Sequence, residues 1–169
     1  MSIIIKKMET DDEIRGKGHV HYKSWQQAYP GLIDQSYLDK MSEQKCEEIA
    51  YRWLDNILVA KDGERVVGFV GYGKCRNEDL CDAGEVFAIY VLAEYYGKGV
   101  GKALMDAALE LLRDYKQVAV WVLKGNERAI RFYEKCGFCI DGKEETVTLG
   151  TPVTEVRMLM KKPLDNQSV

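Results

Sequence analysis

Two nearly continuous apolar runs, separated by a helical pattern, constrain the fold of this chain most. Residues 84–92 (GEVFAIYVL) and 117–123 (QVAVWVL) contain few polar side chains, which is typical of strands covered on both faces of a sheet. Between them a helix is predicted over residues 100–114, with one apolar face formed by Val100, Leu104, Ala107, Ala108 and Leu111. This order of strand, helix and strand predicts a crossover connection.

The rest of the chain divides between helical and strand periodicity. It predicts a strand at residues 3–8, a helix capped by Asp11 or Asp12 that runs towards Ala28, helical structure over 36–54 with Met41 as a candidate break, a hairpin over 57–74, a helix over 126–136 capped by Asn126, and two alternating strands around residues 150–152. In the hairpin, Asp62 and Gly63 are expected to supply the positive φ angles of a tight turn. The sheet is therefore expected to be mixed, and the tail from Pro163 to be loose.

Composition and charge exclude several classes of protein. With 169 residues, 46% hydrophobic and 30% charged, the chain resembles one soluble domain covering residues 1–169. The net charge is −3 and basic residues are interleaved with acidic ones, so no basic face for nucleic acid is expected. The apolar start at residues 2–8 is too short for a signal peptide or a membrane span, and we expect a cytoplasmic protein without a membrane partner.

The cysteines favour neither a disulfide framework nor a metal site. There are five, an odd number, and without a secretion signal they are expected to be reduced. Cys136 and Cys139 have the spacing of a redox motif, but they follow a helix instead of opening one. Cys75 and Cys81 are too far apart for a zinc knuckle. We therefore expect Cys136 and Cys139 to be small buried hydrophobes, and no metal.

Three glycines stand where the first apolar strand meets the next helix. Gly97, Gly99 and Gly101 leave the backbone bare at a helix N-terminus, where free N–H groups and the helix dipole attract anions. A tight loop that needs glycine for its conformation is the structural alternative. A dinucleotide fingerprint would require glycine at Lys102 or Leu104, and a P-loop would require glycine at Tyr96, so neither template fits.

A third template fits residues 85–138. Gly99 and Gly101 match the small positions of a strand, [Q/R]-x-x-G-x-[G/A], helix motif, and a second motif is matched by Asn126, Ala129, Phe132, Tyr133, Gly137 and Phe138. These motifs resemble those of the GNAT superfamily of N-acetyltransferases. The resemblance implies an α/β fold with a mixed, mostly antiparallel sheet of about seven strands and about four helices. It also implies transfer of the acetyl group of acetyl-CoA to a primary amine.

The resemblance further implies which residues bind the cosubstrate. The diphosphate cradle would be Tyr96, Gly97, Lys98, Gly99, Val100, Gly101 and Lys102, and the remaining cofactor contacts would come from Ile89, Tyr90, Val91, Asn126, Ala129 and Phe132. Tyr96 replaces the Gln or Arg of the motif, which puts that side-chain contact in doubt. For Asn126 a pantetheine hydrogen bond competes with an N-cap role. A backbone N–H within Ile89 to Val91 would stabilise the oxyanion of the tetrahedral intermediate.

Acetyl transfer to an amine needs a base and an acid. The resemblance gives the acid role to Tyr133, for which core packing is the alternative. Glu85 begins the strand and is the expected base, unless it is a solvated strand-end carboxylate. His21 is the other base candidate, and a partly buried helix residue is its alternative.

The acceptor pocket is expected along the first helices, where Trp25, Tyr29 and Tyr37 gather beside His21. Aromatic rings bind cations, but they also fill cores. Polyamines, aminoglycosides, amino-acid derivatives and protein N-termini all stay open as acceptors. A non-catalytic acyl-CoA-binding module and a nucleotide-binding regulatory domain are the alternative functions, and a homodimer through an exposed sheet edge is a further expectation.

Overall fold

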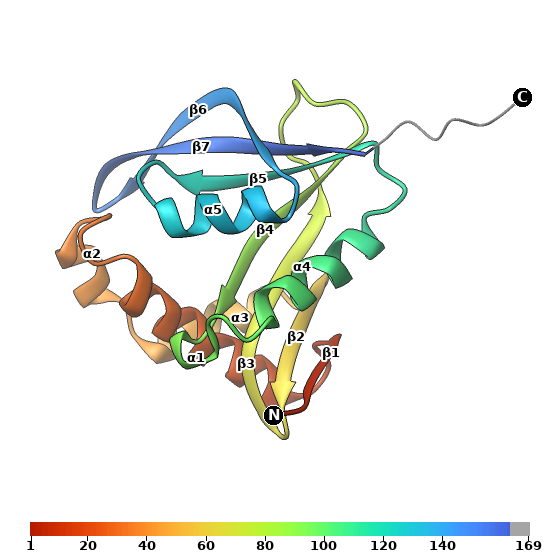
Figure 1. Cartoon of the computed structure of the whole chain (residues 1–169). Helices are drawn as coiled ribbons and strands as arrows, with labels where there is room; N and C mark the ends of the chain where they lie inside the picture. Colours follow the sequence, from red (N-terminus) through yellow and green to blue (C-terminus); the bar gives the residue numbers. More distant parts are fainter. Residues whose placement is uncertain (163–169) are drawn as a thin grey trace, which may run out of the picture.

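The fold is one seven-stranded sheet with helices on both faces (Figure 1). The structure is a computed structural model, and it describes residues 1–162. In chain order the elements are β1 (Ile3–Lys7), α1 (Asp11–Ala28), α2 (Gln35–Lys40), α3 (Glu43–Arg52), β2 (Ile57–Asp62), β3 (Arg65–Lys74), β4 (Ala83–Val91), the 3₁₀ turn η1 (Ala93–Tyr95), α4 (Val100–Leu111), β5 (Gln117–Leu123), α5 (Glu127–Lys135), β6 (Cys139–Leu149) and β7 (Thr151–Lys161). The expected loose tail from Pro163 lies outside the described residues.

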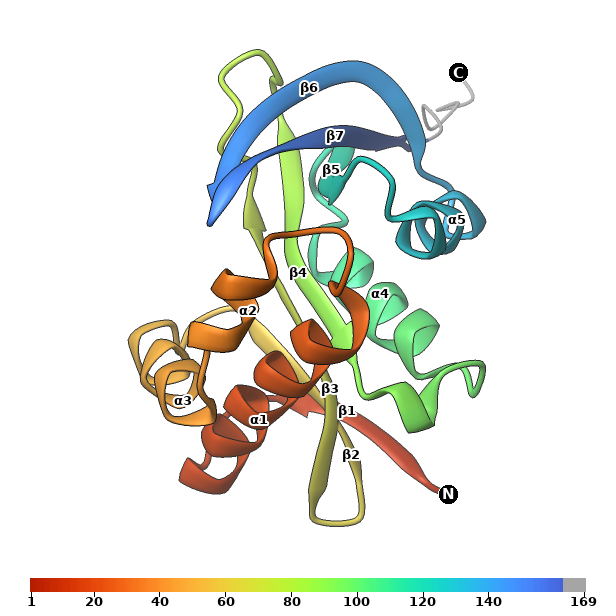
Figure 2. The same cartoon turned by 90° about the vertical axis from the view of Figure 1, so that its left-hand side faces the viewer.

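The sheet is mixed and mostly antiparallel, as predicted. Its strand order is β1-β2-β3-β4-β5-β7-β6, and β4 and β5 are the parallel pair that the crossover through α4 requires. Their pairing ends at Val86 and Val120, although the two strands continue to Val91 and Leu123. Figure 2 shows the two halves of the sheet diverging beyond this point, with α1 and α4 on opposite faces of β3 and β4. The divergence opens a space between two strands that are otherwise buried.

The described residues form five α-helices, where about four were expected. The predicted helical region over residues 36–54 is divided at Met41, which confirms the break. Ser42 begins α3 by accepting a hydrogen bond from the N–H of Lys45 at 3.1 Å. Helix α4 ends at Leu111, earlier than the predicted residue 114.

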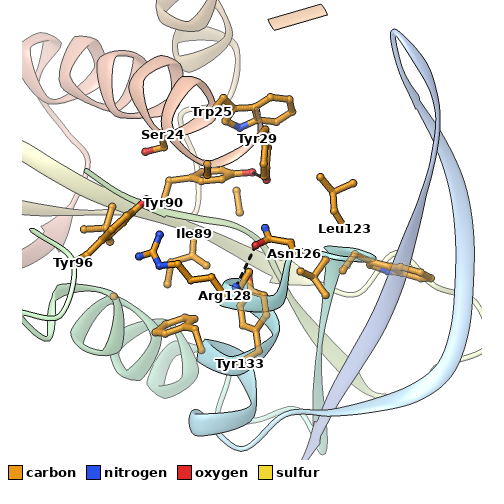
Figure 3. Close-up of a pocket in the computed structure, with 18 of the residues that line it drawn as sticks. Ser24, Trp25, Tyr29, Ile89, Tyr90, Tyr96, Leu123, Asn126, Arg128 and Tyr133 are labelled. Atoms are coloured by element: carbon orange, nitrogen blue, oxygen red, sulfur yellow. Dashed lines mark hydrogen bonds between the residues drawn. The ribbon is translucent and has the colours of Figure 1, made fainter. Parts of the chain in front are cut away.

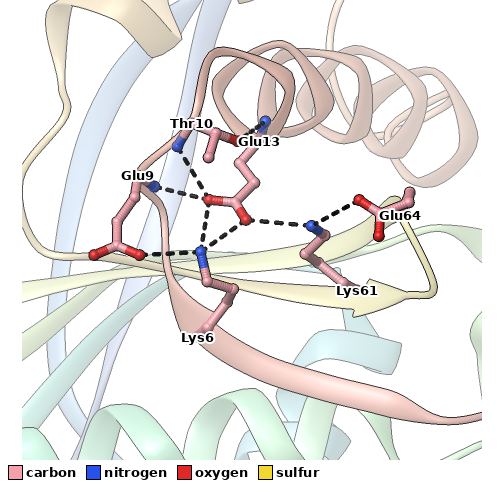
Figure 4. Close-up of polar contacts among 6 residues, drawn as sticks. All are labelled: Lys6, Glu9, Thr10, Glu13, Lys61 and Glu64. Carbon is pink, nitrogen blue, oxygen red and sulfur yellow. Dashed lines mark hydrogen bonds and ion pairs between the residues drawn. The ribbon is translucent and has the colours of Figure 1, made fainter.

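The start of α1 differs from the prediction. Thr10, and not Asp11 or Asp12, is the N-cap: its hydroxyl accepts from the N–H of Glu13, and the Glu13 carboxylate accepts from the N–H of Thr10. This reciprocal capping box places Asp11 and Asp12 inside the first turn, where their negative charges interact favourably with the helix dipole. Figure 4 shows that the Glu13 carboxylate also accepts hydrogen bonds from the side chains of Lys6 and Lys61. These bonds connect α1 to strands β1 and β2.

Two local predictions need correction. The hairpin turn consists of Gly63 and Glu64, because Asp62 still pairs with Arg65. Asp62 and Gly63 were both expected to have positive φ angles, but only Gly63 does, with a φ of 59°. Cys136 is the C-cap of α5 and is partly buried. Gly137 follows it with a positive φ angle, as expected. Cys139 is exposed at the start of β6. The two thiols are therefore not both buried, although all five cysteines are free.

The main core lies between the sheet and the helices that cover it. Leu104, Met105 and Ala108 of α4 are fully buried against the sheet, chiefly against β3 and β4. This confirms the predicted apolar face, except that Leu111 is 49% exposed. Within residues 1–162, none of the helices combines the length and apolarity that crossing a membrane would demand.

Candidate active site

A cavity of about 470 Å³ lies where β4 and β5 diverge. Its walls come from α1, β4, the turn before α4, β5 and α5 (Figure 3). It is lined by these residues predicted from the sequence: Trp25, Tyr29, Glu85, Ile89, Tyr90, Val91, Tyr96, Gly97, Gly99, Val100, Gly101, Lys102, Asn126, Ala129, Phe132 and Tyr133. Lys98 and His21 were also predicted, but they do not line it. The fold thus brings together positions more than 100 residues apart in the chain.

The glycine turn forms one end of the cavity. Gly97 and Gly99 have φ angles of 72° and 81°, and a Cβ added at either position would meet no atom within 4 Å. Their conformation therefore requires glycine, and the space above them is open. Gly99 is the N-cap of α4, whose first hydrogen bond runs from the N–H of Ala103 to the carbonyl of Gly99 at 3.0 Å. The N–H groups before Ala103 have no partner within the helix, which makes this end suitable for an anion.

Arg128 supplies a positive charge beside this turn. Its guanidinium carbon lies 3.2 Å from the centroid of the Tyr96 ring, and both residues line the cavity. Tyr96 occupies the motif position where Gln or Arg was expected. The stacked pair therefore brings a cation to that position from another helix. A basic residue in the first turn of α5 opposes the helix dipole, and this unfavourable placement is a signal for an anionic ligand that could have been found in the sequence.

Asn126 is the N-cap of α5. Its Oδ1 accepts a hydrogen bond from the N–H of Ala129 at 3.3 Å, shown as the dashed line in Figure 3. The oxygen is used in the cap, whereas the side-chain NH₂ group is left to donate into the cavity that Asn126 lines. The two roles that competed in the sequence can therefore use different atoms of one amide.

Tyr133 is buried, on the side of α5 that faces the cavity. Its ring packs edge-on against Phe132 and Phe138, with centroids 5.5 and 5.9 Å away. Burial raises the pKa of Tyr133 well above its ordinary value, and nearby Tyr90 adds to this effect. The phenol therefore keeps its proton at neutral pH, as a hydrogen-bond or proton donor must.

The unpaired edge of β4 lies across the cavity. Residues after Val86 pair with β3, up to Val91 opposite Gly68, but they no longer pair with β5. The hydroxyl of Tyr90 is 3.1 Å from that of Tyr29 at the end of α1, and Trp25 packs edge-on against Tyr29. This edge offers backbone groups and two linked hydroxyls to a ligand between the diverging strands.

Two carboxylates line the cavity, and their surroundings differ. Glu85 of β4 is 1% exposed, so the alternative of a solvated strand end is wrong. Its two oxygens accept hydrogen bonds from the backbone N–H and the guanidinium of Arg76, at 3.2 and 2.9 Å. Glu155 of β7 was not singled out in the sequence, where it looks like one residue of an alternating strand.

His21 lies beside the cavity and not in its wall. Its ring stacks near Tyr90, with centroids 6.3 Å apart, and its Nδ1 is buried without a hydrogen-bond partner. Burial and, secondarily, the charge of Lys17 lower the pKa of His21 from 6.5 to about 4. The ring is therefore neutral at physiological pH.

Two loops approach each other at the end of the cavity near α2. The turn between β6 and β7 reaches the start of α2: a Cβ added at Gly150 would come within 2.8 Å of the Cβ of Asp34 and 3.1 Å of that of Tyr37. Leu149 lines the cavity and packs in a small cluster around Leu38. Two loops far apart in sequence thus narrow this end of the cavity.

Comparison with known proteins agrees with the fold and the motifs. Residues 19–138 match the model of the acetyltransferase (GNAT) family. An uncharacterized N-acetyltransferase of Bacillus subtilis, YuaI, is 32% identical over 130 residues, which is 73% of each chain. Among solved structures, PH1933 from Pyrococcus horikoshii superposes with a TM-score of 0.77 at 24% identity, covering 96% of this chain and 100% of the other. The PaiA N-acetyltransferase of Thermoplasma acidophilum, solved with coenzyme A, gives 0.70 at 23% identity, covering 96% and 100%.

Proposed function

Because this chain belongs to the GNAT family of acetyltransferases, we propose that it transfers the acetyl group of acetyl-CoA to the primary amine of a small molecule. The observation that carries this proposal is the position of the glycine turn. The turn and the free N–H groups of α4 open at one end of the same cavity that Tyr133 lines. The coenzyme A bound to the Thermoplasma acidophilum protein supports this choice of cosubstrate.

The residues of the cavity suit the steps of such a transfer. The backbone of the glycine turn and the cation of Arg128 would hold the diphosphate, and the NH₂ group of Asn126 would donate to the pantetheine arm. A free N–H on the unpaired edge of β4 would stabilise the oxyanion formed when the amine attacks the thioester. Tyr133 would then protonate the thiolate that leaves. Glu85 and Glu155 are the two carboxylates that could take a proton from the amine.

The narrowed acceptor end favours a small acceptor over a protein N-terminus. The close approach of Gly150 to Asp34 and Tyr37 narrows the space between these two loops in which an extended peptide could lie. Aromatic side chains at this end, Trp25 and Tyr29, suit the ammonium group of an amine.

Thiol release from acetyl-CoA tests the proposal, with ethylamine, ethanolamine, 1,4-diaminobutane, glycinamide and a short peptide as acceptors. We expect release with at least one small amine and none with the peptide. Tyr133→Phe should lower kcat by about 10²–10⁴ while coenzyme A binding is kept. Tyr115→Phe is the matched control, because Tyr115 does not line the cavity.

Thermal-shift measurements separate the alternatives. Stabilisation by coenzyme A without turnover of any amine would indicate a non-catalytic binding module. Stabilisation by NAD or ATP, with none by coenzyme A, would contradict the proposal at its first step.

A further inference from the structure

The two carboxylates of the cavity are not equally available to an amine. Both oxygens of Glu85 accept hydrogen bonds from Arg76, whose guanidinium also lies 4.9 Å from the centre of the Phe87 ring. Releasing Glu85 would break this ion pair and leave a carboxylate that is 1% exposed without its counter-charge. Glu85 is therefore a poor partner for an incoming ammonium group.

Glu155 is in the opposite situation. It is partly buried in the cavity wall, and within residues 1–162 no lysine, arginine or histidine forms an ion pair with it; the side chain within hydrogen-bonding reach is the carboxyl group of Glu145. Its neighbour across β6 is Glu145, another carboxylate, and like charges placed opposite each other destabilise a sheet. A bound cation would give Glu155 a counter-charge and would reduce the repulsion between Glu155 and Glu145.

Glu155 also lines the same cavity as the hydroxyls of Tyr29, Tyr90 and Tyr133. It pairs with Leu123 on β5, which lines the cavity beside Asn126. Burial is the largest cause of the raised pKa of Tyr29, and neighbouring Tyr90 is the second. The charges of Tyr133 and Glu155 raise the pKa of Tyr29 further. The carboxylate is thus within electrostatic reach of the pair of tyrosine hydroxyls and on the same cavity as Tyr133.

We propose that Glu155, and not Glu85, is the catalytic carboxylate that receives the ammonium group of the acceptor and removes its proton. This assignment rests on the proposed function. Glu85, held by Arg76, then has the structural role of fixing the segment after β3 at the edge of the cavity.

The proton balance of the step is complete. Glu155 takes one proton from the ammonium group, and the neutral nitrogen attacks the thioester carbon. The carbon–nitrogen bond forms, the nitrogen loses a second proton, and the carbon–sulfur bond breaks. Tyr133 gives its proton to the sulfur, and the second proton from nitrogen restores the phenol. The first proton passes from Glu155 to water, so one proton is released for each amide formed.

The charges around Glu155 favour this role. Burial raises its pKa, Glu145 from β6 and Glu85 from β4 raise it further, and Arg76 from the segment after β3 lowers it. From α1 the facing titratable group is Tyr29, which stays neutral. A raised pKa makes the carboxylate a stronger base.

Two acceptors of similar size separate a base from a structural residue. Ethylamine is protonated at neutral pH, whereas 2,2,2-trifluoroethylamine is not and needs no initial deprotonation. We expect Glu155→Gln to lower kcat/KM for ethylamine by about 100-fold or more, and for trifluoroethylamine by less than about tenfold. Glu144→Gln is the matched control, because Glu144 pairs with Lys124 at the surface and does not line the cavity, and it should change both values by less than about threefold. Retained stabilisation by coenzyme A shows that each variant is folded.

Two results would overturn the assignment. One is an equal loss with both acceptors in Glu155→Gln. The other is a loss confined to ethylamine in Glu85→Gln but not in Glu155→Gln.

A binding measurement keeps this inference apart from the proposed function. If the wild type releases no thiol with any amine, the proposed function fails, and calorimetry with ethylamine in the presence of coenzyme A decides the role of Glu155 in binding. Binding that is lost in Glu155→Gln and kept in Glu144→Gln supports the ammonium site. No binding by the wild type, or binding unchanged by Glu155→Gln, overturns it.

Discussion

The two ends of helix α1 treat buried polar groups in opposite ways. At the N-terminal end, Glu13 is 2% exposed, and its carboxylate accepts from Lys6 at 2.8 and 2.9 Å, Lys61 at 3.3 Å, and the backbone N–H groups of Glu9 at 2.8 Å and Thr10 at 3.2 Å (Figure 4). Towards the cavity, three buried atoms of the same helix have no hydrogen-bond partner: His21 Nδ1, Ser24 Oγ and Trp25 Nε1. Figure 3 shows Ser24 and Trp25.

The difference separates a structural site from a binding site. A buried polar group with all its partners fixes neighbouring elements in place. A buried polar group without a partner costs free energy, and a native fold keeps it where a ligand or water supplies the missing bond. Ser24 and Trp25 are among the residues that line the cavity, so their buried unpaired atoms lie beside the space in which the acceptor is expected.

Removing the satisfied carboxylate should have the largest effect. Glu13→Ala leaves two lysines and two backbone N–H groups without their common acceptor, and we expect a loss of about 3 kcal/mol or more in the free energy of unfolding. Urea denaturation measures it. Glu9→Gln is the control: the Glu9 carboxylate is 67% exposed and 3.1 Å from Lys6, and its loss should cost less than about 1 kcal/mol. Equal costs in the two variants would break the comparison.

Acid should destabilise the two ends of α1 in different pH ranges. The pKa of His21 is lowered from 6.5 to about 4, so the folded state binds this proton less well, and stability is lost as the pH falls through that range. The loss attributable to His21 is at most about 3 kcal/mol. Unfolding measured between pH 7 and 4 should lose this slope in His21→Phe.

Glu13 responds at lower pH. Burial alone would raise its pKa, but hydrogen bonds from Lys6 and from the backbone of Glu9 and Thr10 outweigh burial and lower the pKa from 4.5 to about 2. The stability that Glu13 provides is present above pH 4.5 and is lost as the pH falls towards 2. A slope between pH 7 and 4 that persists in His21→Phe would contradict the separation of the two ranges.

Trp25→Phe should sharpen the contrast between stability and binding. The change keeps an aromatic ring but removes the Nε1–H that has no partner, so we expect unfolding to change by less than about 1 kcal/mol. If the N–H serves the acceptor, the acceptor KM rises by up to about tenfold. Steady-state kinetics against the acceptor, with the acetyl-CoA KM as internal control, distinguish this from a general loss of activity.

Ser24→Ala should give the smallest change. Ser24 is 2% exposed and its buried hydroxyl has no hydrogen-bond partner, so removing the hydroxyl should raise the free energy of unfolding by up to about 1 kcal/mol. Thermal unfolding without ligands measures the gain. A loss of stability would mean that a hydrogen-bonded water already satisfies this hydroxyl, and that it resembles Glu13 more than Trp25.

The local parts of the candidate site could be predicted from the sequence. The glycine turn, the α5 cap and the position of Tyr133 each lie within one short motif, where spacing and backbone conformation decide the outcome. Arg128 and Glu155 were missed because each gains its meaning from a distant residue, Tyr96 in one case and Glu145 with the cavity in the other. The turn at Gly63 and the cap at Thr10 were misplaced by one or two residues, since several neighbouring residue types suit such positions.

By itself the sequence determined the kinds of element, the parallel crossover and the glycine-rich turn before α4, because hydrophobic period and backbone conformation are local properties. Only the tertiary structure decided which carboxylate is paired with an arginine and which, among the described residues, has no cation as a partner. Glu85 and Glu155 are both strand glutamates in the sequence, but Arg76 reaches one and a second glutamate faces the other. Charge pairing depends on distances across the sheet, and these are set when the strands pair and diverge.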